Sequence, residues 1–406
     1  MHASFKFFAP LAVALAMGGC NAGGPTSPEP FAQSNAEARA IPWWQAQNLA
    51  HRACPLAGPG GVQCEALILN EGPARQGGRA VKVHGWGAPD IEAAYNLPSS
   101  TGGSGEIVAV VDYNDNPNVA SDLAVYRRHY GLPKAKFHKY NQDGQQGHYP
   151  QGQVQDGLEE DLDVDMVSAS CPNCTIYLIE SNNNSLGSLV KAEQEAVKLG
   201  ARIISNSFIC YGYPGCDQSK GYETPGVTYL AAAGDESYGV GTPMAYGNVV
   251  SVGGTLLSKR GSIYSEIVWP GTGGGCVPQV AKPSWQHDPG CSGRTTNDVS
   301  AVAWNVPLYD TYGESGWEYS GGTSSATPII AGAFALAGNA ARQDGGKIFW
   351  TLGEAKRRED LHAIDSGTNG CPARLRGSYL CVAGTQQFGT YSGPTGWGTP
   401  NGIGAF

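Results

Sequence analysis

The sequence predicts an α/β protein with a doubly wound, mostly parallel sheet that carries helices on both faces. Apolar, strand-like runs lie at 107–111, 175–180, 202–207, 227–233 and 248–252. Helical patterns alternate with these runs, at 119–130, 156–169, 186–199 and 324–340. Strands that alternate with helices are joined by crossover connections, which set neighbouring strands parallel and cover both faces of the sheet.

Length and composition agree with one large domain. The chain has 406 residues, of which 41% are hydrophobic, and a formal net charge of −9. It is long enough to bury a sizeable core, and its acidic balance excludes a nucleic-acid partner. We expect a monomer.

The first twenty residues have the composition of a secretory signal. Lys6 precedes an apolar stretch from Phe7 to Met17, which is too short to span a membrane as a mature helix. The end of this segment, Met17-Gly-Gly-Cys20, is similar to a bacterial lipoprotein cleavage site, although Met is not favoured at its first position. Lipid attachment at Cys20 and ordinary cleavage a few residues later both remain open. Either way we expect a secreted or cell-envelope protein, with Cys20 as its only means of membrane attachment.

Residues 21–88 form an N-terminal extension ahead of the main domain, which we place at 89–406. The extension carries a short stretch from Ala53 to Cys64 that has the composition of a small cross-linked module. A short pro-segment is one interpretation, and a retained module is the other.

Ten cysteines follow Cys20, and they fall into close pairs. An even count in an exported chain favours disulfides, although sequence alone does not fix their connectivity. Cys171 and Cys174 also fit a redox dithiol, but they follow a helix and lead into a strand, which favours a structural bridge. The pairs by proximity are Cys54/Cys64, Cys171/Cys174, Cys210/Cys216, Cys276/Cys291 and Cys371/Cys381.

Ser324 is the candidate nucleophile. It lies in a run from Ser320 to Gly332, between a glycine turn and the first turn of an apolar helix. Gly321 and Gly322 allow another backbone to approach closely, and unpaired N–H groups at a helix N-terminus can bind a developing oxyanion. The simpler interpretation of this turn is an ordinary helix N-cap.

A second segment supplies candidate acid–base groups. Leu158, Leu162 and Met166 recur at helical spacing and predict a half-buried helix. Glu159 and Asp163 are four residues apart and therefore neighbours on one face. Two carboxylates this close should share a proton, which raises the pKa of one of them. The alternative is a solvated acidic face.

Asp235 follows the strand-like run at 227–233, just past its carboxyl end. In an open parallel sheet this edge collects ligands and catalytic groups. A protonated Asp there can donate a hydrogen bond to an oxyanion, whereas an ionised one would repel it. A turn or N-cap aspartate is the alternative.

Together these three blocks resemble the signature of the sedolisin family, the serine-carboxyl peptidases that share the subtilisin fold. The resemblance covers roughly residues 90–406, and it implies a subtilisin-like sheet. It also implies that Ser324 is the nucleophile, Glu159 the general base, Asp163 its orienting partner and Asp235 the oxyanion-stabilising acid. Substrate contacts are then implied from the neighbouring positions Ser205, Ser207, Gly234, Gly322 and Thr323.

The sequence departs from the family at its calcium site. The two places that usually supply carboxylates carry Ala363 and Ser392, and the nearest remaining candidates are Ile364 and Asp365. Calcium prefers six to eight oxygens, charged ones included, so we expect no strong calcium site and no required cofactor. A second departure is Ile209, where the family normally has glycine on its substrate-side strand. Specificity therefore cannot be taken over from relatives.

These observations favour an exported serine-type peptidase that cleaves peptides or proteins in acid through an acyl-enzyme. The alternative is a non-catalytic exported binding protein that retains the peptidase fold. A neutral-pH subtilisin is disfavoured because none of the eight histidines lies in a His-Gly-Thr-His type run.

Overall fold

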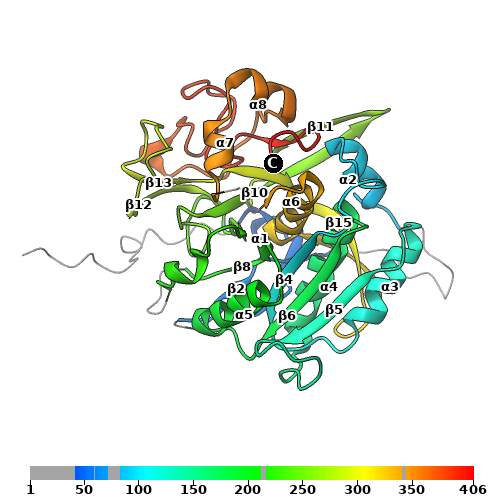
Figure 1. Ribbon diagram of the computed structural model, residues 1–406. Helices are drawn as coiled ribbons and strands as arrows, with labels where there is room; N and C mark the ends of the chain where they lie inside the picture. Colours follow the sequence, from blue (N-terminus) through cyan, green and yellow to red (C-terminus); the bar gives the residue numbers. More distant parts are fainter. Residues whose placement is uncertain (1–41, 59, 72–82, 212–215, 341–343) are drawn as a thin grey trace, which may run out of the picture.

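The computed structural model describes residues 42–58, 60–71, 83–211, 216–340 and 344–406. The expected signal peptide and Cys20 lie outside these residues. Figure 1 shows a central sheet with helices on both sides of it.

The central sheet has the order β11-β10-β9-β7-β4-β6-β5, and β14 also pairs with β10. Every pairing in it is parallel except that of β10 with β11. The expected doubly wound, mostly parallel sheet is therefore confirmed. Its strands are β4 (Ile107–Tyr113), β5 (Lys136–Asn141), β6 (Thr175–Ser181), β7 (Ile203–Asn206), β9 (Thr228–Ala232), β10 (Val249–Arg260), β11 (Ile263–Val268) and β14 (Val299–Val302).

Two apolar cores lie on the two faces of this sheet. Val108 and Val110 of β4 belong to one core, and Ala109 and Val111 belong to the other, as the alternation of a strand requires. The first core also holds residues of α4 and α6, and the second holds residues of α5. The helices are α2 (Ala88–Tyr95), α3 (Val119–His129), α4 (Val154–Ser170), α5 (Leu186–Lys198) and α6 (Thr323–Ala337).

The helix α4 corrects one expectation. The sequence predicts a half-buried helix, yet every residue from Asp156 to Ser170 is buried. The reason is its place in the fold, because α4 packs against α2, α3, α6, the sheet and β15 (Trp304–Asp310). Its acidic side chains are therefore enclosed by protein and do not form a solvated face.

A second, antiparallel sheet has the order β1-β3-β16-β15 and was not predicted. It joins β1 (Ala50–Arg52) and β3 (Leu67–Leu69) of the N-terminal extension to β16 (Gly316–Gly321) and β15. The short strand β2 (Gln63–Cys64) pairs with β8 (Phe208–Ile209). Residues of the extension thus pack directly onto the domain at 89–406.

The remaining elements are short. They are α1 (Trp43–Ala46), β12 (Gly275–Ala281), β13 (Gly293–Thr296), α7 (Lys347–Thr351), α8 (Glu354–Asp360), β17 (Leu361–His362) and β18 (Thr399–Pro400), with 3₁₀ turns at Ser219–Tyr222 and Ala373–Leu375. In the part of the chain that the structure describes, none of the helices has the length and apolarity to cross a bilayer.

All five disulfides expected from sequence proximity are present. Cys171 and Cys174 are joined to each other at the end of α4, as a structural bridge. Each bridge closes a short loop, of 3 to 15 residues in sequence separation. The bridges therefore stiffen local segments and do not link distant parts of the fold.

Candidate active site

The candidate residues meet at the carboxyl edge of the parallel strands. Asp112 lies near the end of β4, Ser207 directly follows β7, and Asp235 comes three residues after β9. Because these strands are parallel, their carboxyl ends share one edge of the sheet. The helix α6 begins at the same place and brings Ser324 to it.

Ser324 is the second residue of α6 and is fully buried. The residue before the helix, Gly322, has φ 112°, a conformation that side chains with a Cβ rarely adopt. The Ser324 hydroxyl donates a 3.3 Å hydrogen bond to the carbonyl oxygen of Ser207. The Ser324 hydroxyl is thus held at the N-terminal end of a helix, where the backbone N–H of Ser324 donates to the carbonyl oxygen of Glu65 at 3.1 Å.

Glu159 and Asp163 lie one turn apart on α4, and both are buried. Oδ1 of Asp163 accepts a 2.7 Å hydrogen bond from the Ser207 hydroxyl. Ser207 therefore contacts Asp163 through its side chain and Ser324 through its backbone. Ser207 thus links the expected nucleophile to one of the two carboxyl groups, that of Asp163.

Burial raises the pKa of Glu159 well above its ordinary value. The charges of Asp163 and Asp112 raise it further, and the Ser324 hydroxyl lowers it by stabilising the carboxylate. Burial also raises the pKa of Asp163; the charge of Asp112 adds to this, while the hydrogen bond from the Ser207 hydroxyl opposes it. Two buried carboxyl groups one helical turn apart, both with raised pKa values, can hold one proton between them.

Asp235 is buried and faces the start of α6. Its Oδ1 accepts hydrogen bonds from the backbone N–H of Thr323, at 2.8 Å, and from the Thr323 hydroxyl, at 3.0 Å. Burial raises its pKa to about 7, although both Thr323 hydrogen bonds and Arg52 act in the opposite direction. Its other oxygen, Oδ2, has no hydrogen-bond partner. Below this pKa the carboxyl group is protonated, and Oδ2 can then donate a hydrogen bond.

Asp112 is a further carboxyl group at this edge of the sheet, near the end of β4. It is buried, and burial together with the charge of Asp156 raises its pKa to about 7. Its charge acts on both Glu159 and Asp163. The signal for this was its position at the carboxyl end of a core strand, the edge where catalytic groups collect.

The five expected substrate contacts are not equivalent. Three of them lie around Ser324, as described above: Ser207, Gly322 and Thr323. Gly234, with φ 97°, lies behind them and donates its backbone N–H to the Thr323 hydroxyl at 3.0 Å. Ser205 lies deeper, inside β7, where it pairs with Val110 and Leu230 of the neighbouring strands.

Ile209 occupies the space beside the site that a glycine would leave open. It is fully buried, and its side chain approaches Gly234 and Gly241 so closely that a Cβ on either glycine would lie 3.3 Å or less from it. The hydroxyl of Tyr211 also lies against Gly234. Bulky side chains therefore fill the space beside Gly234.

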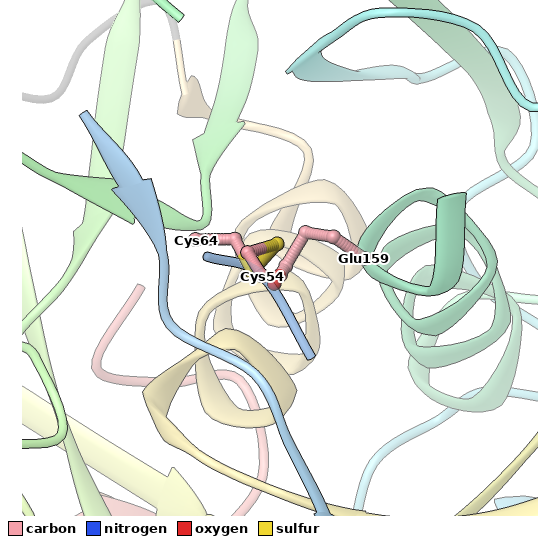
Figure 2. A group of neighbouring side chains, drawn as sticks. All are labelled: Cys54, Cys64 and Glu159. Carbon is pink, nitrogen blue, oxygen red and sulfur yellow. A yellow bond between two sulfur atoms is a disulfide. The ribbon is translucent and has the colours of Figure 1, made fainter. Parts of the chain in front are cut away.

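Three possible ligand atoms also meet near the general-base candidate. Glu159 and the sulfurs of Cys54 and Cys64 lie within 4.8 Å of one another. Figure 2 shows the Glu159 side chain reaching from α4 towards these two cysteines. Because the sulfurs are joined in a disulfide, they are not available to a metal. This group is therefore a packing contact between the extension and the site.

A second cluster of carboxyl groups lies away from Ser324 and accepts hydrogen bonds from a neighbouring loop. Carboxylate oxygens of Asp122, Asp161 and Asp310 lie within 4.8 Å of one another. Asp122 accepts hydrogen bonds from Thr311, and Asp310 accepts them from the backbone of the following loop. These contacts explain the cluster without an ion.

The positions of the family's calcium site do not fit a calcium ion. Ile364 is buried in a small apolar cluster with Val268 and Ala383, and Asp365 is exposed. Ala363 offers no side-chain oxygen, and the Ser392 hydroxyl is hydrogen-bonded to that of Thr395 at 2.8 Å. A single exposed carboxylate with backbone carbonyls is a poor donor set for a hard cation.

A doubly wound sheet with a buried serine and carboxyl groups at its carboxyl edge defines a subtilisin-like protein. Residues 146–358 match the model of the subtilase family, and the chain belongs to this family.

Two relatives refine the comparison. Sedolisin of Pseudomonas sp. (strain 101) is 25% identical over 379 residues, which are 82% of this chain and 62% of the relative. Tripeptidyl-peptidase 1 of Macaca fascicularis is 25% identical over 365 residues, which are 77% of this chain and 62% of the relative. The chain therefore spans about three fifths of the length of each. These matches confirm the resemblance to sedolisins expected from the sequence.

The solved structures bear out the fold. Pseudomonas sedolisin, a serine-carboxyl proteinase complexed with two molecules of pseudo-iodotyrostatin, superimposes with a TM-score of 0.66 at 24% identity. The match covers 79% of this chain and 96% of that structure.

Proposed function

We propose that this protein is a serine-carboxyl peptidase that hydrolyses peptide bonds at acidic pH. The observation that carries the proposal is the meeting of Ser324 with the buried pair Glu159 and Asp163. The Ser324 hydroxyl acts on the Glu159 carboxylate and lowers its pKa, so we assign Glu159 as the base that serves the serine.

In the proposed reaction, the Ser324 Oγ attacks the carbonyl carbon of the substrate peptide as Glu159 takes the hydroxyl proton. Asp163 shares that proton and keeps Glu159 oriented. The backbone N–H of Ser324 and protonated Asp235 stabilise the oxyanion. Glu159 then passes the proton to the leaving amine, and the C–N bond breaks. Water attacks the acyl-enzyme with the help of the same base and releases the acid product.

The proposed preference for acidic pH follows from the protonation states that the site requires. The site needs one proton on the carboxyl pair and one on Asp235, whose pKa of about 7 sets an upper limit. As pH rises through that value, Asp235 ionises and would repel the oxyanion. We propose no metal in this reaction, because calcium has no suitable donor set at the usual positions.

We also propose that the protein works outside the cytoplasm. Five disulfides within the described residues support an oxidising compartment. A signal at residues 1–20, with or without a lipid at Cys20, would supply the export.

The test is hydrolysis of a mixed peptide library by the full-length protein from about pH 3 to pH 7, after incubation in acid. Ser324→Ala should abolish cleavage, and the matched control Ser325→Ala, one residue further along α6, should retain it. Glu159→Gln should behave like Ser324→Ala. Cleavage that survives Ser324→Ala would refute the mechanism. A folded wild type that binds peptides without cutting them would instead support a non-catalytic binding protein.

A further inference from the structure

The face of the sheet opposite α4 holds a buried carboxyl group that the proposed reaction does not use. Glu193 lies on α5, at helical spacing from the core residues Leu189 and Ala196, and its side chain is fully buried. Neither of its oxygens has a hydrogen-bond partner among the described residues. Buried polar atoms without a partner are rare in folded proteins, so this group calls for an explanation.

Glu193 is uncharged in the folded protein at acidic pH. Burial raises its pKa well above the ordinary value, and the Asn206 side chain acts in the opposite direction. Asn206 is the only described residue that acts on this pKa besides burial itself, so no cation balances a charge on Glu193. An uncharged carboxyl group carries one O–H, which can donate a hydrogen bond.

Asn206 has the acceptor that this O–H needs. It is the last residue of β7, and its side chain is fully buried. Its Nδ2 donates a 3.0 Å hydrogen bond to the carbonyl oxygen of Leu230 in β9, whereas its Oδ1 has no partner among the described residues. A hydrogen bond from protonated Glu193 to this oxygen would satisfy both unpaired groups. The Asn206 amide would then bridge α5, β7 and β9.

The strand ends that this amide joins carry residues of the candidate site. Ser207 directly follows Asn206 and points to the other face of the sheet, as the alternation of a strand requires. There its hydroxyl donates to Asp163 at 2.7 Å, and its carbonyl oxygen accepts from the Ser324 hydroxyl at 3.3 Å. The neighbouring strand β9 leads to Asp235. A shift of Asn206 would therefore be transmitted to the proposed nucleophile and to its carboxyl partner.

We propose that uncharged Glu193 is a positioning residue of this peptidase: it holds the Asn206 amide by a hydrogen bond, and Asn206 holds Ser207 against Ser324 and Asp163. This inference rests on the proposed function. Glu193 touches neither the substrate nor the reacting atoms, and it acts from the opposite face of the sheet. Its effect should fall on kcat, because the geometry of the reacting groups changes while the surface that binds the peptide does not.

The groups that face Glu193 from neighbouring elements offer no charge to balance its ionised form. Burial raises the pKa values of Tyr222 and Tyr229, and a charge on Glu193 would raise both further. Phenols of this kind are uncharged in the acidic and neutral range. The Tyr229 hydroxyl donates to that of Thr224 at 3.0 Å, and Arg202 acts on Tyr229 but not on Glu193. These surroundings favour the protonated form of Glu193, which is the form that can hold Asn206.

The first experiment separates positioning from packing. Glu193→Leu fills the space without a donor, whereas Glu193→Gln keeps a donor. Near pH 4, kcat for a peptide substrate should fall roughly 10-fold or more in Glu193→Leu with KM nearly unchanged, and Glu193→Gln should restore it. The control Glu195→Gln makes the same change two residues along α5, where the carboxylate is paired with Lys198, and should leave kcat unchanged. An unchanged kcat in Glu193→Leu, or an equal loss in Glu193→Gln, would overturn the proposal.

The second experiment asks whether Glu193 carries the proton, and it needs no catalysis. Ser324→Ala is the parent protein, and the measurement is made near pH 6, where exposed carboxyl groups are ionised. The infrared C=O band of protonated carboxyl groups should weaken when Glu193→Gln is added to this parent, and it should not change when Glu195→Gln is added. An unchanged band in Glu193→Gln would show that Glu193 is ionised and would overturn the proposal.

The third experiment observes the position of Ser207 directly. In crystal structures of the Ser324→Ala protein, the 2.7 Å hydrogen bond from the Ser207 hydroxyl to Asp163 should persist with Glu193→Gln and lengthen beyond hydrogen-bonding reach with Glu193→Leu. This readout decides the matter even if the wild type cuts no peptide. A displaced Ser207 would then support the positioning role and leave only the proposed function refuted, whereas an unmoved Ser207 would overturn the positioning role.

Discussion

Asp112→Asn should make the protein more stable at neutral and mildly alkaline pH. Asp112 is buried near the end of β4, and its Oδ2 has no hydrogen-bond partner. Burial, assisted by the charge of Asp156, raises its pKa from 3.8 to about 7. Asparagine has nearly the shape of the protonated acid but cannot ionise, so the variant isolates the cost of a buried charge.

The sign and size follow from proton linkage. Because the folded-state pKa is raised, the stability that Asp112 contributes is fully present below pH 4 and is lost as pH rises through about 7. Each pKa unit corresponds to about 1.4 kcal/mol, so this single group removes about 4 kcal/mol of unfolding free energy across that window. The variant does not lose this stability as pH rises. Its free energy of unfolding should equal that of the wild type near pH 4 and exceed it by up to about 4 kcal/mol near pH 8.

Urea unfolding at several pH values from about 4 to 8 measures this difference. Both proteins carry Ser324→Ala, which prevents self-digestion during the measurement. Asp365→Asn makes the same charge change at an exposed position and serves as the matched control. If the free energies of unfolding of Asp112→Asn and the wild type differ by the same amount at pH 4 and at pH 8, the reasoning is refuted.

Three further predictions concern the site. In Asp235→Asn, the side-chain oxygen can still accept a hydrogen bond from the Thr323 N–H, and the amide group adds a permanent donor. The fall of kcat/KM as pH rises through about 7 should therefore disappear. An unchanged pH profile would contradict the role proposed for Asp235. Gly322→Ala forces an alanine to adopt φ 112° and crowds the proposed oxyanion position, so kcat/KM should fall roughly 100-fold. The control Gly239→Ala has only one atom near its Cβ position and should leave kcat/KM unchanged. Ile209→Ala opens the pocket beside Gly234 and should raise kcat/KM for peptides with a large apolar residue at the attacked position by about 10-fold relative to small ones; an unchanged ratio would show that Ile209 does not set specificity.

The central sheet and its helices were predictable because their signals are local. The expected helix at 186–199 and strand at 175–180 are observed as α5 and β6, with ends that differ by one residue. The five disulfides were predictable for the same reason, since each closes a short loop. The antiparallel pairings of β1, β2 and β3 were not, because these strands are two or three residues long and gain their stability from partners far away in the chain.

The site shows the same division between local and distant information. The α-helical spacing of Glu159 and Asp163 makes them neighbours wherever the helix lies, so their pairing could be predicted from sequence. Their complete burial could not, because it depends on the elements that pack around α4, which are α2, α3, α6, β15 and strands of the central sheet. The position of Glu65 beside Ser324 could not be predicted either, since the two residues lie 259 positions apart in the sequence. A charged residue in a short stretch bounded by cysteines gives no sign of the partner that it contacts.

The burial of α4 links stability to the proposed chemistry. Glu160, Asp161 and Asp165 are enclosed with the catalytic pair, and burial raises the pKa of each well above its ordinary value. Carboxyl groups of this kind are neutral in acid and cost little there, but each one that ionises on the way to neutral pH opposes folding. The protein therefore has most of its stability in the pH range where Asp235 is protonated and Glu159 shares a proton with Asp163. The acidic conditions that the proposed oxyanion site requires would thus also keep the enclosed helix folded, so a variant adapted to neutral pH would need changes in both places.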